Sequence, residues 1–337
     1  MGVRFRAAGL ALMALTLMAS LPAVAQTPAR KAPAGKWEQP KTPWGDPDLG
    51  GIWNNVTATP LQRPENQDKA LLTDEEAREA ERQAIQRRDA NEATPVAQQS
   101  AGARTGYSPS IWFETTQALS QGRTSLLVEP SNGRLPDLTA EARKAQLAEV
   151  AARKVAPADK PEDRGPYERC ITRGMPGAMM PGFYNHNYHI LQTPGYVVIQ
   201  VEMVHDSRII PMDGRPHVGS QIKQWLGDSR GRWEGNTLVV ETTNMRNVEQ
   251  RNVAVFGTSE KGKVIERFTR LSADSMEYTI TVDDPPTYTK SWTASLPMTK
   301  VPGPLYEYAC HEGNYGLPNI LAGHRLEERE AAAKQAK

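Results

Sequence analysis

The 337-residue sequence has almost no excess charge of either sign and lacks the motifs of several large protein classes. Lysine and arginine number 40 against 39 aspartates and glutamates, so net charge does not favour nucleic acid or an anionic membrane as a partner. No H-E-x-x-H, Walker or G-x-G-x-x-G motif is present, and no serine is interpreted as the centre of a nucleophile elbow. These absences disfavour zinc proteases, nucleotide-binding proteins and the common serine hydrolases.

Long apolar runs are also missing, except at the N-terminus. Arg4 and Arg6 precede an apolar run over residues 7–21, and Ala23-Val24-Ala25 then forms a small-x-small cleavage site. The run is shorter than the roughly 20 residues that a membrane-spanning helix needs. We therefore expect a signal peptide cleaved near Ala25, a periplasmic or secreted protein, and no stable membrane insertion.

Cysteine is scarce, because Cys170 and Cys310 are the only two in the chain. In an oxidising compartment such a pair favours a disulfide. Closing so long a loop is worth about 4 to 5 kcal/mol in the chain-entropy model, before any strain. Two free thiols, or one half of a metal site, are the alternatives.

What is present changes in character along the chain. Thr73 and Glu76 form a capping box that predicts one surface helix, and Thr139 predicts the start of a second. Two tryptophans between Thr42 and Asn54 predict an extended arm that docks through aromatic side chains. The predicted parts are a signal peptide (1–25), a flexible tether (26–43), an N-terminal arm with surface helices (44–160), an antiparallel β domain (161–325) and the polar end of a C-terminal helix (326–337).

Strand patterns dominate from Tyr167 onward, and the turns between them are too short for crossover helices. This predicts a mainly β fold, an antiparallel barrel or sandwich with flanking helices. Asp228–Gly231 is interpreted as a turn. The predicted strands are Tyr184–Gln192, Tyr196–Val204, Arg208–Met212, Ile222–Leu226, Arg232–Trp233, Thr237–Thr243, Val264–Arg270, Met276–Val282, Tyr288–Met298 and Leu305–Cys310.

Four runs carry a resemblance: RTSLLVEPSNGRLP, MDGRPH, GDSRGRWEGNTLVVETTN and YEYACHEGNYG. Together they resemble a family of secreted bacterial proteins without an assigned activity. The resemblance covers Trp44 to about Gly323 and implies one shared architecture for the mature chain. The later strands are also similar to lipocalin-like calycin barrels, which implies a shape but no catalytic residues.

The stretch from Tyr184 to His217 holds four of the six histidines and predicts a site. If Pro194-Gly195 is a two-residue turn, His189 lies opposite Gln200, and Glu202 becomes its diagonal neighbour on the same face. A disulfide would bring the segment after Cys310 toward the same end. The candidate catalytic residues are therefore His189, Glu202, His217 and His311.

A polar corner follows, in which Arg215 is suited to hold a carboxylate or phosphate and His217, paired with Asp213 or Asp206, would be an oriented base. An ion-pair lattice that holds the turn is the alternative. The methionine-rich loop Thr172–Gly182 suits an apolar ligand, or else fills the core. The candidate substrate-binding residues are His186, Asn187, Asp206, Arg208, Arg215, Met179 and Met180.

His186, His189 and His205, with Glu202 and Asp206, have the residue types of a zinc or iron site. On a regular strand, however, His186 and His189 point to opposite faces. We therefore predict no metal ligand and no cofactor. The sequence favours an exported β-barrel protein that binds a small, largely apolar or aromatic molecule; the alternative is a periplasmic acid/base enzyme, less readily a metal-dependent one, that acts on such a molecule.

Overall fold

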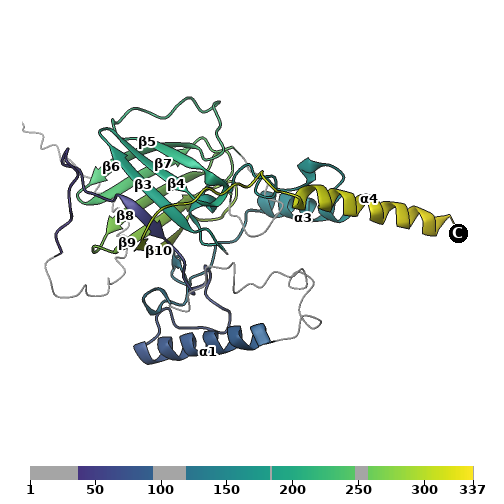
Figure 1. Cartoon of the computed structure of the whole chain (residues 1–337), viewed down its shortest axis with the longest axis horizontal. Coiled ribbons are helices and arrows are strands. Elements are labelled where there is room, and N and C mark those ends of the chain that lie inside the picture. Colours follow the sequence, from purple (N-terminus) through teal and green to yellow (C-terminus); the bar gives the residue numbers. More distant parts are fainter. Residues whose placement is uncertain (1–36, 94–118, 183, 247–256, 337) are drawn as a thin grey trace, which may run out of the picture. The chain divides into compact units, whose positions relative to one another are not determined.

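The computed structural model describes residues 37–93, 119–182, 184–246 and 257–336 (Figure 1). The predicted signal peptide, its cleavage site and most of the tether lie outside the described residues. The described residues all belong to one compact unit, Ala32–Lys337.

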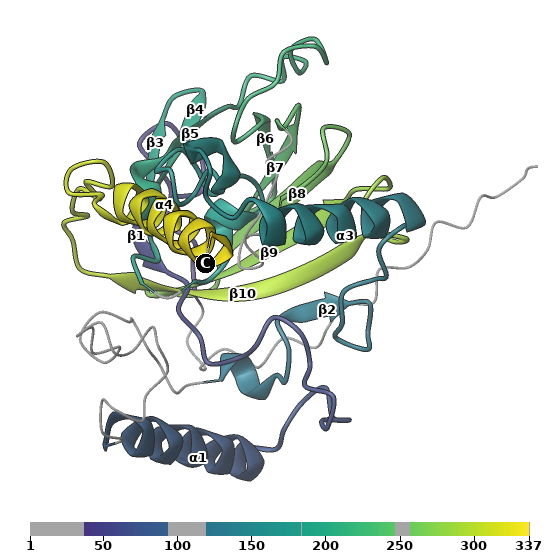
Figure 2. The ribbon, with the colours of Figure 1, turned by 90° about the vertical axis from the view of Figure 1, so that its right-hand side faces the viewer.

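The core of the molecule is an antiparallel sheet of nine strands that curls into a nearly closed barrel (Figures 1 and 2). The mainly β fold predicted from the sequence is thus confirmed. A tenth strand, β2, pairs with β10 off the main path. The order around the barrel is β5 (Ser207–Pro211), β4 (Tyr196–Val201), β3 (Asn187–Thr193), β1 (Gly51–Asn54), β10 (Trp292–Val301), β9 (Ser275–Asp283), β8 (Lys263–Arg270), β7 (Thr237–Thr243) and β6 (Asp228–Glu234), and β2 is Leu127–Glu129.

Alternating apolar side chains explain why these segments form strands with a buried inner face. In β9, Met276, Tyr278, Ile280 and Val282 are all buried, as their spacing predicts. The turn between β3 and β4 has two residues, because Thr193 pairs with Tyr196. The predicted register, His189 opposite Gln200, is confirmed by this pairing.

The boundary predicted at residue 161 is wrong, because β1 from the N-terminal arm is a barrel strand between β3 and β10. Trp53 is fully buried, and its indole donates a 2.9 Å hydrogen bond to the Leu49 carbonyl. The prediction of aromatic docking was correct for Trp53. A four-residue strand that begins at the second of two glycines is too short to show a period, which is why the pattern indicated only an arm.

The turn predicted at Asp228–Gly231 is also wrong, since these residues begin β6. Gly231 lies within the strand opposite Val240, and a Cβ there would overlap the Met212 side chain. The glycine therefore marks a close approach inside a strand, not a turn. Of the expected strands, Ile222–Leu226 supplies only an isolated bridge from Gln224 to Met245, and Leu305–Cys310 is not a strand.

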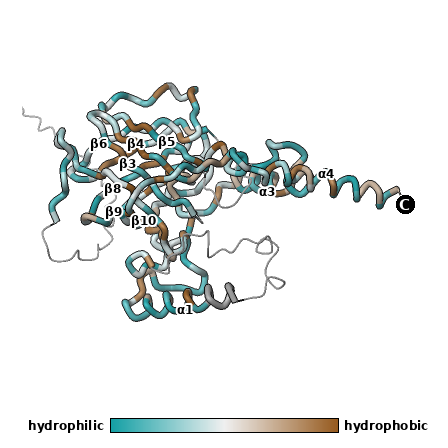
Figure 3. Tube along the Cα trace, in the orientation of Figure 1, coloured by the Kyte–Doolittle hydropathy of each residue, from teal (hydrophilic) through white to brown (hydrophobic). Residues whose placement is uncertain are grey.

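In the part of the chain that the structure describes, three α-helices flank the barrel: α1 (Asp74–Ala93), α3 (Ala140–Val155) and α4 (Gly316–Gln335). The predicted capping box is present, because the Glu76 amide donates to Thr73 Oγ1 at 3.2 Å and the Thr73 amide donates to Glu76 Oε2 at 2.9 Å. Thr139 caps α3 by accepting from the Ala142 amide at 3.1 Å. Figure 3 shows mostly hydrophilic residues along α1. Within the described residues, none of the helices combines the length and apolarity needed to cross a membrane.

Candidate functional site

The barrel interior contains a buried ion pair. Arg208 of β5 reaches Glu266 of β8 with both terminal nitrogens, one of them at 2.8 Å from Oε1. Tyr278 donates to the same carboxylate at 2.9 Å, and Ser229 and Thr242 complete the network. Burial lowers the pKa of Arg208, but Glu266 outweighs this and raises it. The charge of Arg208, a predicted substrate-binding residue, is therefore neutralised inside the protein.

Ser229 stands in the sequence Gly227-Asp228-Ser229-Arg230-Gly231, which has the spacing of a nucleophile elbow. The structure shows a different context, because Ser229 lies inside β6 and shares a 2.9 Å hydrogen bond with Thr242. It is buried beside the Arg208–Glu266 pair and has no adjacent histidine partner among the described hydrogen bonds. Ser229 belongs to the interior network and not to a catalytic triad.

The methionine-rich loop closes the barrel end at which β3 begins and β4 ends. Met179 and Met180, with the short helix η5 (Gly177–Met179), are buried in the hydrophobic core. Asn55 donates from Nδ2 to the Met179 carbonyl at 3.0 Å and to the Tyr188 hydroxyl at 3.1 Å. Both methionines thus fill the core, which was the second of the two interpretations of this loop.

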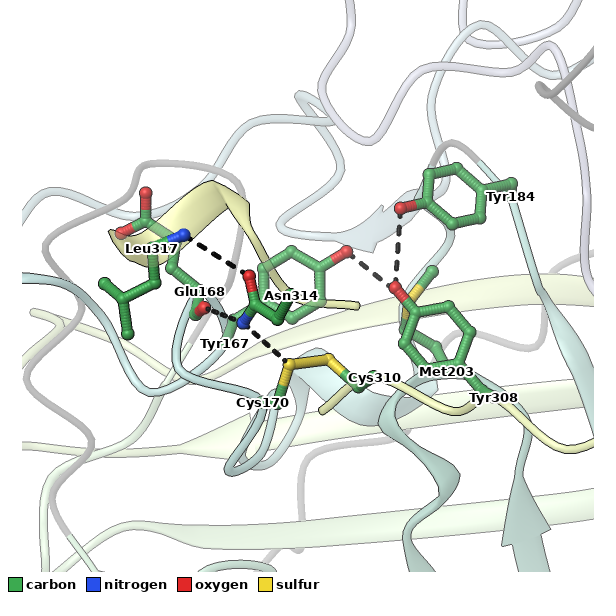
Figure 4. The surroundings of a disulfide bond; sticks show 9 residues. All are labelled: Tyr167, Glu168, Cys170, Tyr184, Met203, Tyr308, Cys310, Asn314 and Leu317. Atoms are coloured by element: carbon green, nitrogen blue, oxygen red, sulfur yellow. Dashed lines mark hydrogen bonds between the residues drawn. A yellow bond between two sulfur atoms is a disulfide. The ribbon is translucent and has the colours of Figure 1, made fainter. Parts of the chain in front are cut away.

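The predicted disulfide is present between Cys170 and Cys310, which are 140 residues apart in the sequence and have a Cα separation of 5.6 Å. Asn314 links the bond to the start of α4, because its amide donates to Cys170 Sγ and to the Glu168 carbonyl, both at 3.3 Å (Figure 4). The disulfide joins the segment before the methionine-rich loop to the segment after β10. It therefore brings together side chains from distant parts of the chain.

Three tyrosines gather beside this disulfide, from three separate segments. Tyr184 and Tyr308 share a hydrogen bond of 3.4 Å between their hydroxyls, with ring centroids 6.4 Å apart (Figure 4). Tyr167 donates to the sulfur of Met203 at 3.4 Å, and Met203 lies in the short helix η6 (Met203–His205) after β4. All three rings are partly buried against the core. We call Tyr167, Tyr184, Tyr308 and Met203 the tyrosine cluster.

Arg173 lies next to the tyrosine cluster, with its guanidinium carbon 5.7 Å from the centroid of the Tyr167 ring. The residue is only 5% exposed. Among the described residues no side-chain or backbone acceptor takes a hydrogen bond from it, no carboxylate pairs with it, and Nε is both shielded from solvent and unpartnered. The burial of Nε is therefore not compensated by a hydrogen bond.

The phenols of Tyr167 and Tyr308 remain neutral donors over the physiological range. Burial, reinforced by Tyr184, raises the pKa of Tyr167 to about 12, although nearby Arg173 opposes the shift. Burial and the hydrogen bond with Tyr184 raise the pKa of Tyr308 as well. The cluster therefore offers hydroxyl groups and aromatic faces beside one fixed positive charge.

The predicted catalytic residues on the strand face do not converge in the described structure. Glu202 is buried and accepts hydrogen bonds from Asn187, from the side-chain Nδ2 at 2.8 Å and from the backbone N–H at 3.4 Å. His189 is half-buried and lines a groove of about 290 Å³ between β3 and the arm that contains Trp44. His311 is exposed. No described hydrogen bond or ion pair joins these three predicted catalytic residues.

His217 has a partner other than those predicted. Its Nδ1 lies 2.9 Å from Asp228, and its Nε2 lies 3.4 Å from Glu241. Burial raises the pKa of Asp228, but hydrogen bonds from the Val218 amide, His217 and Arg230 outweigh it, so the pKa is lowered. Because both imidazole nitrogens face carboxylates, this group matches the ion-pair lattice rather than a free base. Asp213, one expected partner, pairs instead with the exposed Arg215.

Two further predicted residues lie near the disulfide end. Thr172 donates from Oγ1 to Asp206 at 2.9 Å, and burial raises the pKa of this carboxyl although that hydrogen bond opposes the shift. His186 is buried, and its Nδ1 accepts from the Gly182 amide at 3.3 Å. The one group with metal-binding geometry in the described ranges is Asp159, His324 and Glu328, none of which was a candidate ligand. Arg325 already pairs with the two carboxylates of this group, Asp159 at 3.3 Å and Glu328 at 3.1 Å.

The tyrosine cluster and Arg173 were not among the predicted site residues, although the sequence contains a signal for them. Tyr167 precedes Cys170 by three residues, and Tyr308 precedes Cys310 by two. Once a disulfide is predicted between these cysteines, the two tyrosines must lie near each other. Arg173 follows in the same segment.

Comparisons with known proteins add little to this geometry. No family model matches the sequence, and the curated proteins contain no match. Among solved structures, a secretary abundant heat soluble (SAHS) protein from Ramazzottius varieornatus aligns with 41% of this chain and 87% of its own, at 12% identity and a TM-score of 0.24. The assignment of the barrel therefore rests on the strand pairing of this chain itself.

Proposed function

We propose that this protein is an exported β-barrel protein that binds a small, largely apolar or aromatic molecule at the tyrosine cluster. The observation that carries the proposal is the convergence of three partly buried phenol rings and a thioether, held at one barrel end by a disulfide. Aromatic faces and a flexible methionine suit an apolar body, while hydroxyls orient it. Export is supported by the disulfide, since such bonds persist in oxidising compartments.

The barrel does not need to be hollow for this function. The interior residues of β7, β8 and β9 are buried against one another and around the Arg208–Glu266 pair. The tyrosine cluster instead lies where the strands end, on segments that carry little of the strand pairing. A ligand could therefore bind there without disturbing the sheet.

The test is titration of the purified mature protein with the neutral probe N-phenylnaphthylamine, followed by its fluorescence. Tyr308→Ala should weaken probe binding about tenfold or more, because it removes an aromatic face and a hydroxyl from the cluster. Tyr306→Ala is the matched control, since Tyr306 is 71% exposed and lies two residues away. Unchanged affinity in a folded Tyr308→Ala variant would place the binding site elsewhere.

A further inference from the structure

We propose that Arg173 makes this site selective for anions, so that the ligand is an aromatic or apolar acid whose carboxylate or sulfonate pairs with the buried guanidinium. This inference rests on the proposed function, because it names the class of molecule that the tyrosine cluster takes. It goes beyond that function, which a neutral aromatic molecule would equally satisfy.

Arg173 differs from the other buried arginines in the described part of the chain, Arg123, Arg208 and Arg270. Arg123 donates to Ser120 and to the Ser295 carbonyl, and Arg208 pairs with Glu266. Arg270 donates to three backbone carbonyls, at 3.1, 3.0 and 2.8 Å. Each of these three guanidinium groups is held by acceptors of the protein, whereas Arg173 has only the face of the Tyr167 ring.

The N–H donors of the Arg173 guanidinium are suited to an anionic group. A guanidinium presents its N–H groups in a planar fork that matches the two oxygens of a carboxylate or the oxygens of a sulfonate. The cation–π contact with Tyr167, 5.7 Å from the guanidinium carbon to the ring centroid, takes no hydrogen bond from these donors. A carboxylate or sulfonate therefore matches the donors that this contact leaves unused.

A glycine, Gly182, lies beside the terminal nitrogens of Arg173. A Cβ built on this residue would stand 3.3 and 3.4 Å from the two terminal nitrogens of Arg173 and 3.0 Å from Cε1 of His186. Any side chain at this position would press on the donors. The glycine therefore keeps the guanidinium and the buried imidazole of His186 close to bare backbone, with no side chain between them and this segment.

The tyrosine cluster supplies the surface for the rest of the proposed ligand. The phenols of Tyr167 and Tyr308 stay protonated, because burial raises the pKa of both, so they do not repel an anion and can donate to it. The rings of the cluster and Met203 supply the apolar surface. One fixed positive charge beside aromatic faces matches a molecule with one negative group on an aromatic or apolar body.

The experiment uses two fluorescent probes that differ in one group, anilinonaphthalene sulfonate and its neutral counterpart N-phenylnaphthylamine. Arg173→Met should weaken binding of the sulfonate about tenfold or more while changing affinity for the neutral probe less than about twofold. Arg173→Lys should recover only part of the loss, since an ammonium lacks the planar fork. Arg232→Met, which removes an exposed charge from β6, controls for net charge.

A second measurement needs only the wild-type protein, in case a variant does not fold. Benzoate and benzamide have nearly the same shape, and benzoate should displace the neutral probe at about a tenfold lower concentration. Equal potency of the two competitors, or equal loss of both probes in Arg173→Met, would overturn anion selectivity while leaving the proposed binding function intact. Failure of the neutral probe to respond to Tyr308→Ala would instead overturn the binding site itself.

Discussion

Arg208 and Arg173 are both buried arginines, yet their surroundings differ in kind. Arg208 lies among barrel strands and is held by Glu266, with Ser229 and Thr242 beside its guanidinium. Arg173 lies on a loop at the barrel end and has no carboxylate partner among the described residues. A buried charge costs several kcal/mol unless it is paired, and only Arg208 has a carboxylate to pair with among the described residues. The difference separates a structural network from the proposed binding site.

The largest expected effect comes from breaking the satisfied pair. Glu266→Leu should lower the free energy of unfolding by about 3 to 5 kcal/mol, because it leaves Arg208 buried without a partner. The double variant Arg208→Met with Glu266→Leu should recover much of this loss, since a well-packed apolar pair often replaces a buried ion pair at little cost. Urea denaturation of the two variants measures both effects. A double variant no more stable than Glu266→Leu would show that the network contributes more than charge pairing.

Removal of the Cys170–Cys310 disulfide tests the region of Arg173 and the tyrosine cluster. Replacing Cys170 and Cys310 by serine should lower the free energy of unfolding by about 2 to 4 kcal/mol, because the bond closes a long loop in the unfolded chain. Since the bond also holds Tyr308 near Tyr184, binding of the neutral probe should weaken in the folded double variant. Denaturation and probe titration on the same sample measure both. Undiminished affinity for the neutral probe would mean that the tyrosine cluster forms without the Cys170–Cys310 bond.

The contrast between the two arginines also shows what the sequence could predict. The alternation in β9 and the capping box at Thr73 depend on neighbouring residues, and both were predicted correctly. The partner of Arg208 depends on which strands face each other across a barrel, which a list of strands does not determine. His217 shows the same limit, because its partner Asp228 stood in a segment interpreted as a turn. Only the disulfide provided a long-range constraint, and it pointed to the region of the tyrosine cluster.

The smallest expected effect concerns Asp206, which accepts from Thr172, the residue before Arg173. Burial raises its pKa above the ordinary value of 3.8, so the folded protein binds this proton more tightly than the unfolded chain does. The resulting stability is fully present below about pH 4 and is lost as pH rises through the folded-state pKa. At neutral pH the ionised carboxylate therefore costs stability, and Asp206→Asn should stabilise the protein slightly while keeping an acceptor for Thr172.

Asp228→Asn is the matched control, because hydrogen bonds lower the pKa of Asp228 despite its burial. The stability that this carboxylate contributes is present above pH 3.8 and is lost as pH falls through the folded-state pKa. Asp228→Asn should therefore destabilise at neutral pH, and both differences from wild type should shrink in acid. Denaturation of the wild type and of the two variants from acid to neutral pH measures how each difference in stability changes with pH. If Asp206→Asn instead destabilised at neutral pH, its carboxylate would have an ionic partner near Arg173, and the guanidinium would no longer be the unpaired charge on which anion selectivity depends.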